Sequence, residues 1–301
     1  MMKEFAFRTL SGMLTLLSCL PLGVLYVISD FLFVLVYYIV RYRRDLVARN
    51  LAASFPDKEE KELKRIARKF YRNFTDYIVE TVKLLHISDE EMSRRMVFEN
   101  LDIIERHIAS GRSVTVYFSH AGNWEWAPSV TLHMHHTEGR AVDFCQVYRP
   151  LRSEVFDRLM LKVRSRFGSI SFPKATVFRS LFKLSREGVY TVTGFMSDQK
   201  PSHGDPTVPL MFLNRPTAFI SGTETLCRRL GHAAVYWDME KTSRGHYRIV
   251  TREICADPST VADGDITRRY AEMLQTTILR NPSIWLWTHN RWKIPVQLPL
   301  Q

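Results

Sequence analysis

A histidine and a glutamate stand five positions apart in the stretch His-Ala-Gly-Asn-Trp-Glu, residues 120–125. A neutral imidazole can take a proton from an attacking hydroxyl, and a neighbouring carboxylate can fix its tautomer and stabilise the imidazolium that forms. We therefore interpret His120 as a candidate general base and Glu125 as the candidate residue that orients it. Spacing alone equally allows a loop histidine followed by a first-turn carboxylate that the helix dipole favours.

A strand followed by a tight turn would hold these two side chains. Residues 114–118 are β-branched, aromatic and apolar, as a short buried strand requires, and Gly122 with Asn123 interrupts that pattern. If a helix began at or before His120, Glu125 would lie about 140° round its axis and the two side chains would diverge. We predict that His120 lies in the turn and Glu125 in the first turn of the next helix, where they can meet.

The rest of the chain alternates short apolar runs with helical patterns. Its 301 residues are 46% hydrophobic, which excludes general disorder and allows one large core. We predict an α/β fold, a mixed central sheet flanked by helices, with strands at residues 114–118, 141–147, 189–195, 233–237 and 247–251. Apolar residues at helical spacing predict an amphipathic helix over 57–86, which packs on the domain or lies along a membrane. A shorter helix is expected from Ser88, with Glu91 completing a capping box.

The N-terminal segment has the composition of a membrane anchor. Residues 22–40 are almost entirely apolar and close to the roughly 20 residues that a spanning helix needs. Arg41, Arg43 and Arg44 follow directly, which favours a cytoplasmic location for the remainder. A buried hairpin of a soluble protein is the alternative, which Asp30 keeps open because a carboxylate in a bilayer needs a protein or water partner. We divide the chain into an anchor, residues 1–44, and a cytoplasmic catalytic domain, residues 45–301.

The formal charge of +11 belongs entirely to residues 41–301, since the charges of residues 1–40 cancel. Acidic partners fit this charge: membrane phosphates, a phosphorylated lipid or an acidic carrier protein. No nucleic-acid motif accompanies it, so we expect no nucleic-acid partner. The scattered cysteines suit a reduced compartment without structural zinc. His133, His135 and His136 lack a carboxylate that would complete a familiar metal site, and we expect no metal.

The residues around His120 resemble the active-site signature of the late acyltransferases of lipid A biosynthesis, the lauroyl and myristoyl transferases of Gram-negative bacteria. Other segments resemble the family in the same order along the chain: Arg49-Asn50-Leu51, Ser54-Phe55-Pro56, Val147-Tyr148-Arg149-Pro150, Ser197-Asp198-Gln199 and residues 287–293. The chain departs from the family pattern at Asn290 and Trp292, where Arg and Phe are expected, and has Glu125 where related acyltransferases often carry Asp.

The resemblance implies a glycerolipid acyltransferase-like fold and transfer of a fatty acyl chain from acyl carrier protein to a hydroxyl of a lipid A precursor. The reaction would take place at the cytoplasmic face of the bacterial inner membrane, among its phospholipids, without a cofactor. His120 would deprotonate the acceptor hydroxyl and Glu125 would orient His120. Arg149 follows a predicted strand at a sheet edge where ligands often bind, and its guanidinium suits a substrate or phosphopantetheine phosphate.

Three further residues are weaker candidates for substrate binding. Arg164, with Arg166 nearby, could assist Arg149 or belong to a solvated helix face. Asp198 and Gln199 follow the predicted strand at 189–195 and could line the acyl or acceptor site, or shape the turn before Pro201.

Two other functions remain open from the sequence. The same His-and-acid chemistry would serve an acyltransferase for another lipid, such as a lysophospholipid or a glycolipid. Alternatively, the chain could be a non-catalytic membrane-surface protein that binds acidic lipids through its basic face.

Overall fold

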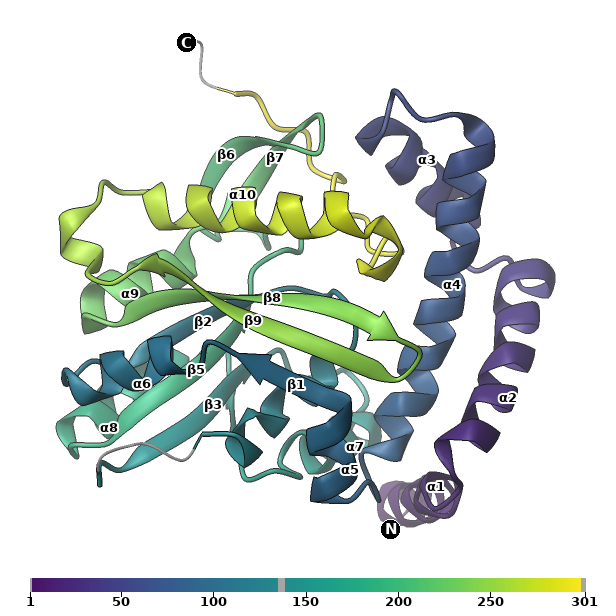
Figure 1. Cartoon of the computed structure of the whole chain (residues 1–301), viewed down its shortest axis with the longest axis horizontal. Helices are drawn as coiled ribbons and strands as arrows, with labels where there is room; N and C mark the ends of the chain where they lie inside the picture. Colours follow the sequence, from purple (N-terminus) through teal and green to yellow (C-terminus); the bar gives the residue numbers. More distant parts are fainter. Residues whose placement is uncertain (1, 135–138, 299–301) are drawn as a thin grey trace.

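The computed structural model describes residues 2–134 and 139–298 (Figure 1). Its centre is a seven-stranded sheet in the order β1-β9-β8-β2-β5-β3-β4. These strands are β1 (Met96–Glu99), β2 (Val114–Phe118), β3 (Val142–Tyr148), β4 (Ile170–Pro173), β5 (Tyr190–Met196), β8 (Ala233–Ser243) and β9 (His246–Cys255). Only β8 and β9 pair antiparallel, and the other neighbours are parallel. The predicted α/β fold with a mixed sheet is confirmed.

The five predicted strands correspond to β2, β3, β5, β8 and β9, and β2 has the predicted bounds. The sequence did not predict β1 and β4, which are four-residue strands at the two edges of the sheet. It also missed a separate antiparallel hairpin of β6 (Thr207–Phe212) and β7 (Arg215–Ile220). Edge and hairpin strands bury less of their surface, so their apolar pattern is weaker.

Helices cover both faces of the sheet. Buried side chains of one face pack against α5 (Asp89–Arg95), α6 (Asp102–Ala109), the 3₁₀ segment η2 (Trp124–Leu132) and α7 (Glu154–Arg164). The other face carries α8 (Val177–Arg186), α9 (Gly222–Leu230) and α10 (Asp265–Arg280). Two short 3₁₀ turns, η3 (Pro258–Thr260) and η4 (Pro282–Ile284), flank α10.

The N-terminal part forms α1 (Met2–Ser18), α2 (Leu22–Phe33), a π-helical extension η1 (Val34–Ile39) and α3 (Arg44–Ser54). The segment Leu22–Ile39 is long and apolar enough to cross a membrane, and only 28% of it is buried. Its exposed side chains include Val27, Phe31 and Ile39. The segment is therefore mostly exposed, whereas the alternative that the sequence left open was a buried hairpin.

The predicted amphipathic helix is α4 (Glu60–Lys83), and α2 lies along it (Figure 1). It begins three residues later than its Asp57 signal indicated, with Glu59 at the N-cap. The predicted capping box of α5 is confirmed in part, since the Ser88 side chain accepts a hydrogen bond from the Glu91 backbone N–H. Asp30 of α2 forms an ion pair with Arg244, 2.8 Å away, so this carboxylate faces a protein partner.

Candidate active site

The turn after β2 is shaped by Gly122, which has a φ of +61°. A Cβ atom here would lie 2.5 Å from the Met239 sulfur, so the turn requires glycine for both space and conformation. The Gly122 N–H donates to the Ile284 carbonyl, and the His120 carbonyl accepts from the Leu286 N–H. The C-terminal segment therefore fixes the backbone on both sides of Ala121. His120 lies in this turn, as predicted.

His120 and Asp198 meet because β2 and β5 are parallel neighbours. Phe118 is paired with Met196 in the register, and each candidate residue lies two positions beyond its paired strand residue. The His120 Nδ1 atom is 2.7 Å from Asp198 Oδ1, and the His120 backbone N–H donates to Asp198 Oδ2 over 3.0 Å. One carboxylate thus fixes both the ring and the main chain of the histidine.

Asp198 is held as a carboxylate inside the protein. It is only 2% exposed, and its Oδ2 also accepts a hydrogen bond from the Trp285 indole N–H at 2.9 Å. Burial by itself raises the pKa of a carboxyl group, but the charge and hydrogen bonds of His120, with that of Trp285, lower the pKa of Asp198 to about 2. An ionised Asp198 favours the tautomer of His120 with the proton on Nδ1.

The other ring nitrogen of His120 faces Gln199. Its Nε2 lies 3.1 Å from the Gln199 side-chain amide nitrogen, which is a donor, so this arrangement suits an unprotonated Nε2. Trp124 packs edge-on against the imidazole, with ring centroids 5.1 Å apart. Nε2 therefore carries the free lone pair of the imidazole and directs it at the Gln199 amide.

Glu125 does not make the predicted contact with His120. It is in the first turn of η2, as expected, but its two carboxylate oxygens accept hydrogen bonds from Arg164 Nε and Nη2 at 2.8 and 2.6 Å. Both ring nitrogens of His120 are meanwhile occupied by Asp198 and Gln199. The expectation that Glu125 orients the imidazole is wrong, because a nearer carboxylate from the neighbouring strand fills that position.

The ion pair of Glu125 and Arg164 also changes the role expected for the arginine. Glu125 is 3% and Arg164 16% exposed by side chain. Burial opposes the charge of Arg164, whereas the hydrogen bonds and charge of Glu125 raise the pKa of its guanidinium. Since Nε and Nη2 of Arg164 are bound to Glu125, they are not directed at a substrate phosphate. Arg166 binds the Ile87 carbonyl and Asp89.

A buried carboxylate on α4 supports the turn from behind. Oε2 of Glu80 accepts hydrogen bonds from the Asn123 amide and the Tyr247 hydroxyl, each at 2.8 Å, and Oε1 accepts one from the Tyr26 hydroxyl at 3.0 Å. Burial raises the pKa of Glu80 above its usual range, and the charge of Lys241 with the hydrogen bonds from Asn123 and Tyr247 only partly offsets the effect. The network connects α2, α4, β9 and the turn that carries His120. No sequence signal pointed to Glu80, because its partners come from three distant segments.

Arg149 is exposed in the loop after β3, as its position at a sheet edge predicted. Burial raises the pKa of Asp205, but the hydrogen bond and charge of Lys174, 2.7 Å away, lower it overall, and the charge of Arg149 contributes to that lowering. Lys174 lies beside the same loop, because its backbone N–H donates to the Tyr148 carbonyl. Arg149 is therefore available to an anionic ligand near the carboxyl ends of β3 and β4.

His133 ends η2, and its ring packs against Phe98 with centroids 5.1 Å apart. His135 and His136 lie outside the described residues. Within residues 2–134 and 139–298, no group of three His, Cys, Asp or Glu side chains could hold a metal ion.

The model of the family "Bacterial lipid A biosynthesis acyltransferase" matches residues 2–294 of the chain. That match covers α1 to α10, the catalytic turn and the C-terminal segment that fixes it. No curated protein matched the chain.

Proposed function

Because the chain belongs to the bacterial lipid A biosynthesis acyltransferase family, we propose that it transfers a fatty acyl chain from acyl carrier protein to a hydroxyl of a lipid A precursor. The family resemblance of the sequence motifs is confirmed, and with it the class of enzyme, an acyltransferase. The observation that carries the proposal to particular residues is the pairing of His120 with the buried carboxylate of Asp198 at 2.7 Å.

In this mechanism the acceptor hydroxyl replaces Gln199 at the Nε2 atom of His120. The imidazole takes the hydroxyl proton while the oxygen attacks the thioester carbonyl carbon, which forms a tetrahedral intermediate. The intermediate collapses by breaking the carbon–sulfur bond, and the departing thiolate receives the proton from the imidazolium. Asp198 stays ionised throughout and stabilises the imidazolium, since its pKa is about 2. No covalent enzyme intermediate is required.

Glu125 keeps a place in the site, but as a positioning residue. Its ion pair with Arg164 ties the start of η2 to α7, and η2 begins at Trp124, which packs on the imidazole. Trp124 is also stacked on Tyr77, with ring centroids 4.2 Å apart. We infer that the pair keeps Trp124 against His120 and so limits the motion of the base.

A narrow crevice beside the turn is lined by Phe74 and Tyr77 of α4, by Gly122 and Trp124, and by Leu286, with Asn73 and Lys241 among its polar walls. Its volume of about 10 Å³ has room for little more than one water molecule, so an acyl chain would enter it only if these side chains moved apart. A chain admitted here would reach the turn that carries His120, because Trp124 contacts both the crevice and the imidazole.

The protein would work at the inner membrane with its catalytic domain in the cytoplasm. The apolar segment Leu22–Ile39 supports this location, together with the arginines that follow it. Exposed basic residues of α4, including Arg68, Lys69 and Arg72, would contact anionic phospholipid headgroups.

The test uses the full-length protein extracted in detergent, acyl carrier protein loaded with a mixture of saturated chains, and a tetra-acylated lipid A precursor. We expect the acceptor to gain the mass of one acyl group, and the gain to be lost in His120→Ala protein that remains folded. Acylation of a lysophospholipid or a glycolipid instead would change the acceptor in the proposal. Full activity of His120→Ala, or inertness toward every acceptor, would overturn it.

A further inference from the structure

Two phenylalanines stand side by side on the outer face of α8. Phe178 is 41% and Phe182 49% exposed, and their rings stack with centroids 6.3 Å apart. The inner face of the same helix is buried through Val177 and Leu181. The helix is therefore already anchored to the sheet, and the phenylalanine pair is an additional apolar surface. Exposed aromatic pairs of this kind are enriched at protein interfaces.

Basic side chains lie beside the pair, on one flank of the helix. Arg179, Lys183 and Arg186 are exposed on α8, and Arg229 is exposed on α9. Across the described ranges, no ion pair involves any of the three arginines, and Lys183 has only a long contact of 3.7 Å with Glu187. We call Phe178, Arg179, Phe182, Lys183, Arg186 and Arg229 the α8 surface.

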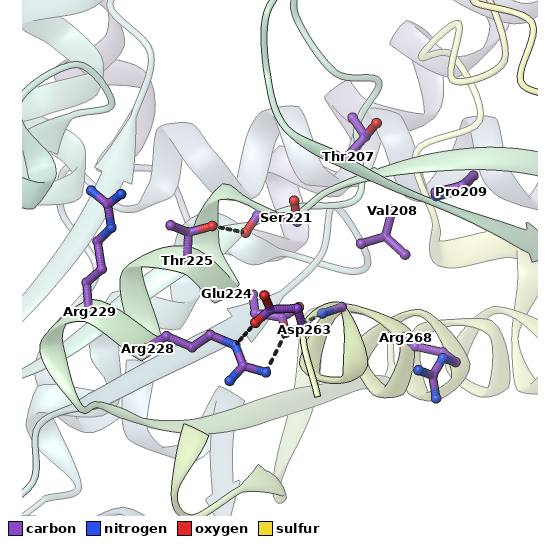
Figure 2. A pocket seen from close by; sticks show the side chains of 11 residues that line it. Thr207, Val208, Pro209, Ser221, Glu224, Thr225, Arg228, Arg229, Asp263 and Arg268 are labelled. Carbon is purple, nitrogen blue, oxygen red and sulfur yellow. Dashed lines mark hydrogen bonds and ion pairs between the residues drawn. The ribbon is translucent and has the colours of Figure 1, made fainter. Parts of the chain in front are cut away.

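Arg229 is one of the residues that line the hollow beside α9, but its side chain takes no part in the ion pairs there. Figure 2 shows Arg228 directed toward Glu224 and Asp263, while Arg229 extends away from them. Arg228 is fixed there by ion pairs to both carboxylates. The helices α8 and α9 are neighbours on this face of the sheet, because Leu181 and Leu184 of α8 share an apolar cluster with Leu226 and Leu230 of α9.

The position of α8 relates its outer face to the reaction. The helix follows β4, whose last residue pairs with Tyr148 at the end of β3. Parallel strands end at the same edge of the sheet, so the start of α8 lies at the edge that carries His120 and Asp198. In the sequence, Arg149 and Lys174 lie between His120 and the start of α8. Meanwhile α8 and α2 stand on opposite sides of the molecule (Figure 1).

We propose that the α8 surface docks the acidic acyl carrier protein that delivers the acyl chain. This inference rests on the proposed function and adds the place where the donor binds. The arginines would meet carboxylates of the carrier, the phenylalanine pair would cover its apolar side chains, and the flexible prosthetic arm would pass Arg149 to reach His120.

Placement favours a carrier protein over a membrane as the occupant. The anchor helix α2 lies along α4 (Figure 1), and the exposed Arg72 of α4 lies over the Phe33 ring of α2, which sets the membrane on this side of the molecule. A surface on the far side faces the aqueous phase, where the soluble carrier diffuses. A basic surface there would accelerate the encounter with an acidic partner at low salt.

The test compares two double charge reversals in the full-length protein. Arg179→Glu/Arg186→Glu changes the α8 surface. The matched control, Arg94→Glu/Arg106→Glu, alters the net charge equally at exposed last-turn positions of α5 and α6, on the opposite face of the sheet. Initial rates are measured against acyl carrier protein and against a small acyl-pantetheine thioester that lacks the acidic protein. Co-sedimentation with anionic phospholipid vesicles is measured in parallel.

We expect the α8 reversal to raise the KM for acyl carrier protein about tenfold or more at low salt, with less effect at high salt. The kcat, the turnover of the small thioester and vesicle binding should match those of the control. An unchanged KM, or an equal loss with the small thioester, would overturn the inference. Lost vesicle binding with an unchanged KM would identify the surface as a membrane contact instead.

A binding titration separates this inference from the proposed reaction. Acyl carrier protein is titrated against His120→Ala protein, with and without the α8 reversal, so no turnover is needed. Binding that the reversal weakens supports docking even if no acyl transfer is found. If the enzyme transfers acyl chains from the carrier but both titrated proteins bind the carrier equally, the proposed reaction stands and the α8 surface is not the docking site.

Discussion

Asp198 binds His120 at two points, through the imidazole Nδ1 at 2.7 Å and through the backbone N–H at 3.0 Å. The first contact sets the tautomer, and the second prevents the turn from carrying the ring away from the carboxylate. Trp285 occupies the remaining side of the same carboxylate oxygen. His120 is therefore held by Asp198, two residues beyond β5, and by the C-terminal segment as well as by its own turn.

Replacing Asp198 with Asn should lower kcat about 10²- to 10⁴-fold, because the amide fails to select the Nδ1-protonated tautomer or to stabilise the imidazolium. The KM values for donor and acceptor should change little. The measurement is steady-state kinetics of Asp198→Asn, His120→Ala and the double variant. Since the two residues act as one unit, the double variant should be about as slow as the slower single one. Additive losses would contradict the pairing.

The buried ion pair gives a second prediction. Replacing Arg164 with Met leaves Glu125 unpaired at 3% exposure, which should reduce the free energy of unfolding by about 3–5 kcal/mol. Removing both charges, as in Glu125→Gln/Arg164→Met, should restore much of that loss. Chemical denaturation of the wild type, Arg164→Met and Glu125→Gln/Arg164→Met measures the two losses of stability. The same changes at the exposed pair of Glu60 and Lys64 serve as the matched control. Equal destabilisation by the single and double variants would show that the charge is not the cause.

Sequence patterns predicted the strands that carry the site better than the contacts between its side chains. The run 114–118 is buried at every residue, so its apolar composition identified β2 with the observed bounds. The apolar segment at residues 22–40 was equally easy to recognise from the sequence, because apolar residues face outward there as well as inward. Both features are local and need no knowledge of which segments become neighbours.

The partner of His120 depended on strand order, which no local pattern encodes. Both strands were predicted, but only their adjacency brings Asp198 opposite His120 across 78 residues of chain. The sequence motif predicted Glu125, five residues from His120, as the partner of the imidazole. In the structure Glu125 binds Arg164 instead. Asp198 and Gln199 were predicted as substrate-binding residues, and the structure brings both to the imidazole.

A third prediction concerns Glu80, which accepts hydrogen bonds from Asn123, Tyr247 and Tyr26. Glu80→Ala should leave these donors without an acceptor and cost at least about 2 kcal/mol of stability, at about 1–3 kcal/mol per unsatisfied buried group. It should also lower kcat by loosening the turn that carries His120. Glu80→Gln keeps an acceptor oxygen and should retain most of both properties. Glu60→Ala, at an exposed position of the same helix, serves as control. Equal kcat values for Glu80→Ala and wild type would separate this network from the catalytic turn.

The last prediction is a loss of stability in mild acid through a buried histidine. His232 is 3% exposed, with its Nδ1 3.2 Å from the Thr115 hydroxyl, and burial lowers its pKa to about 4. Above the unfolded pKa of about 6.5, His232 is neutral in both states and imposes no cost. As the pH falls from about 6.5 to 4, only the unfolded chain takes up this proton, so stability decreases by up to about 3 kcal/mol, of which about 2 kcal/mol is lost by pH 5. The difference between the denaturant midpoints at pH 7 and pH 5 should therefore be smaller for His232→Gln than for the wild type. As a control, His203→Gln changes an exposed histidine and should show the same midpoint difference as the wild type. If His232→Gln also shows that difference, the buried imidazole does not limit stability in acid.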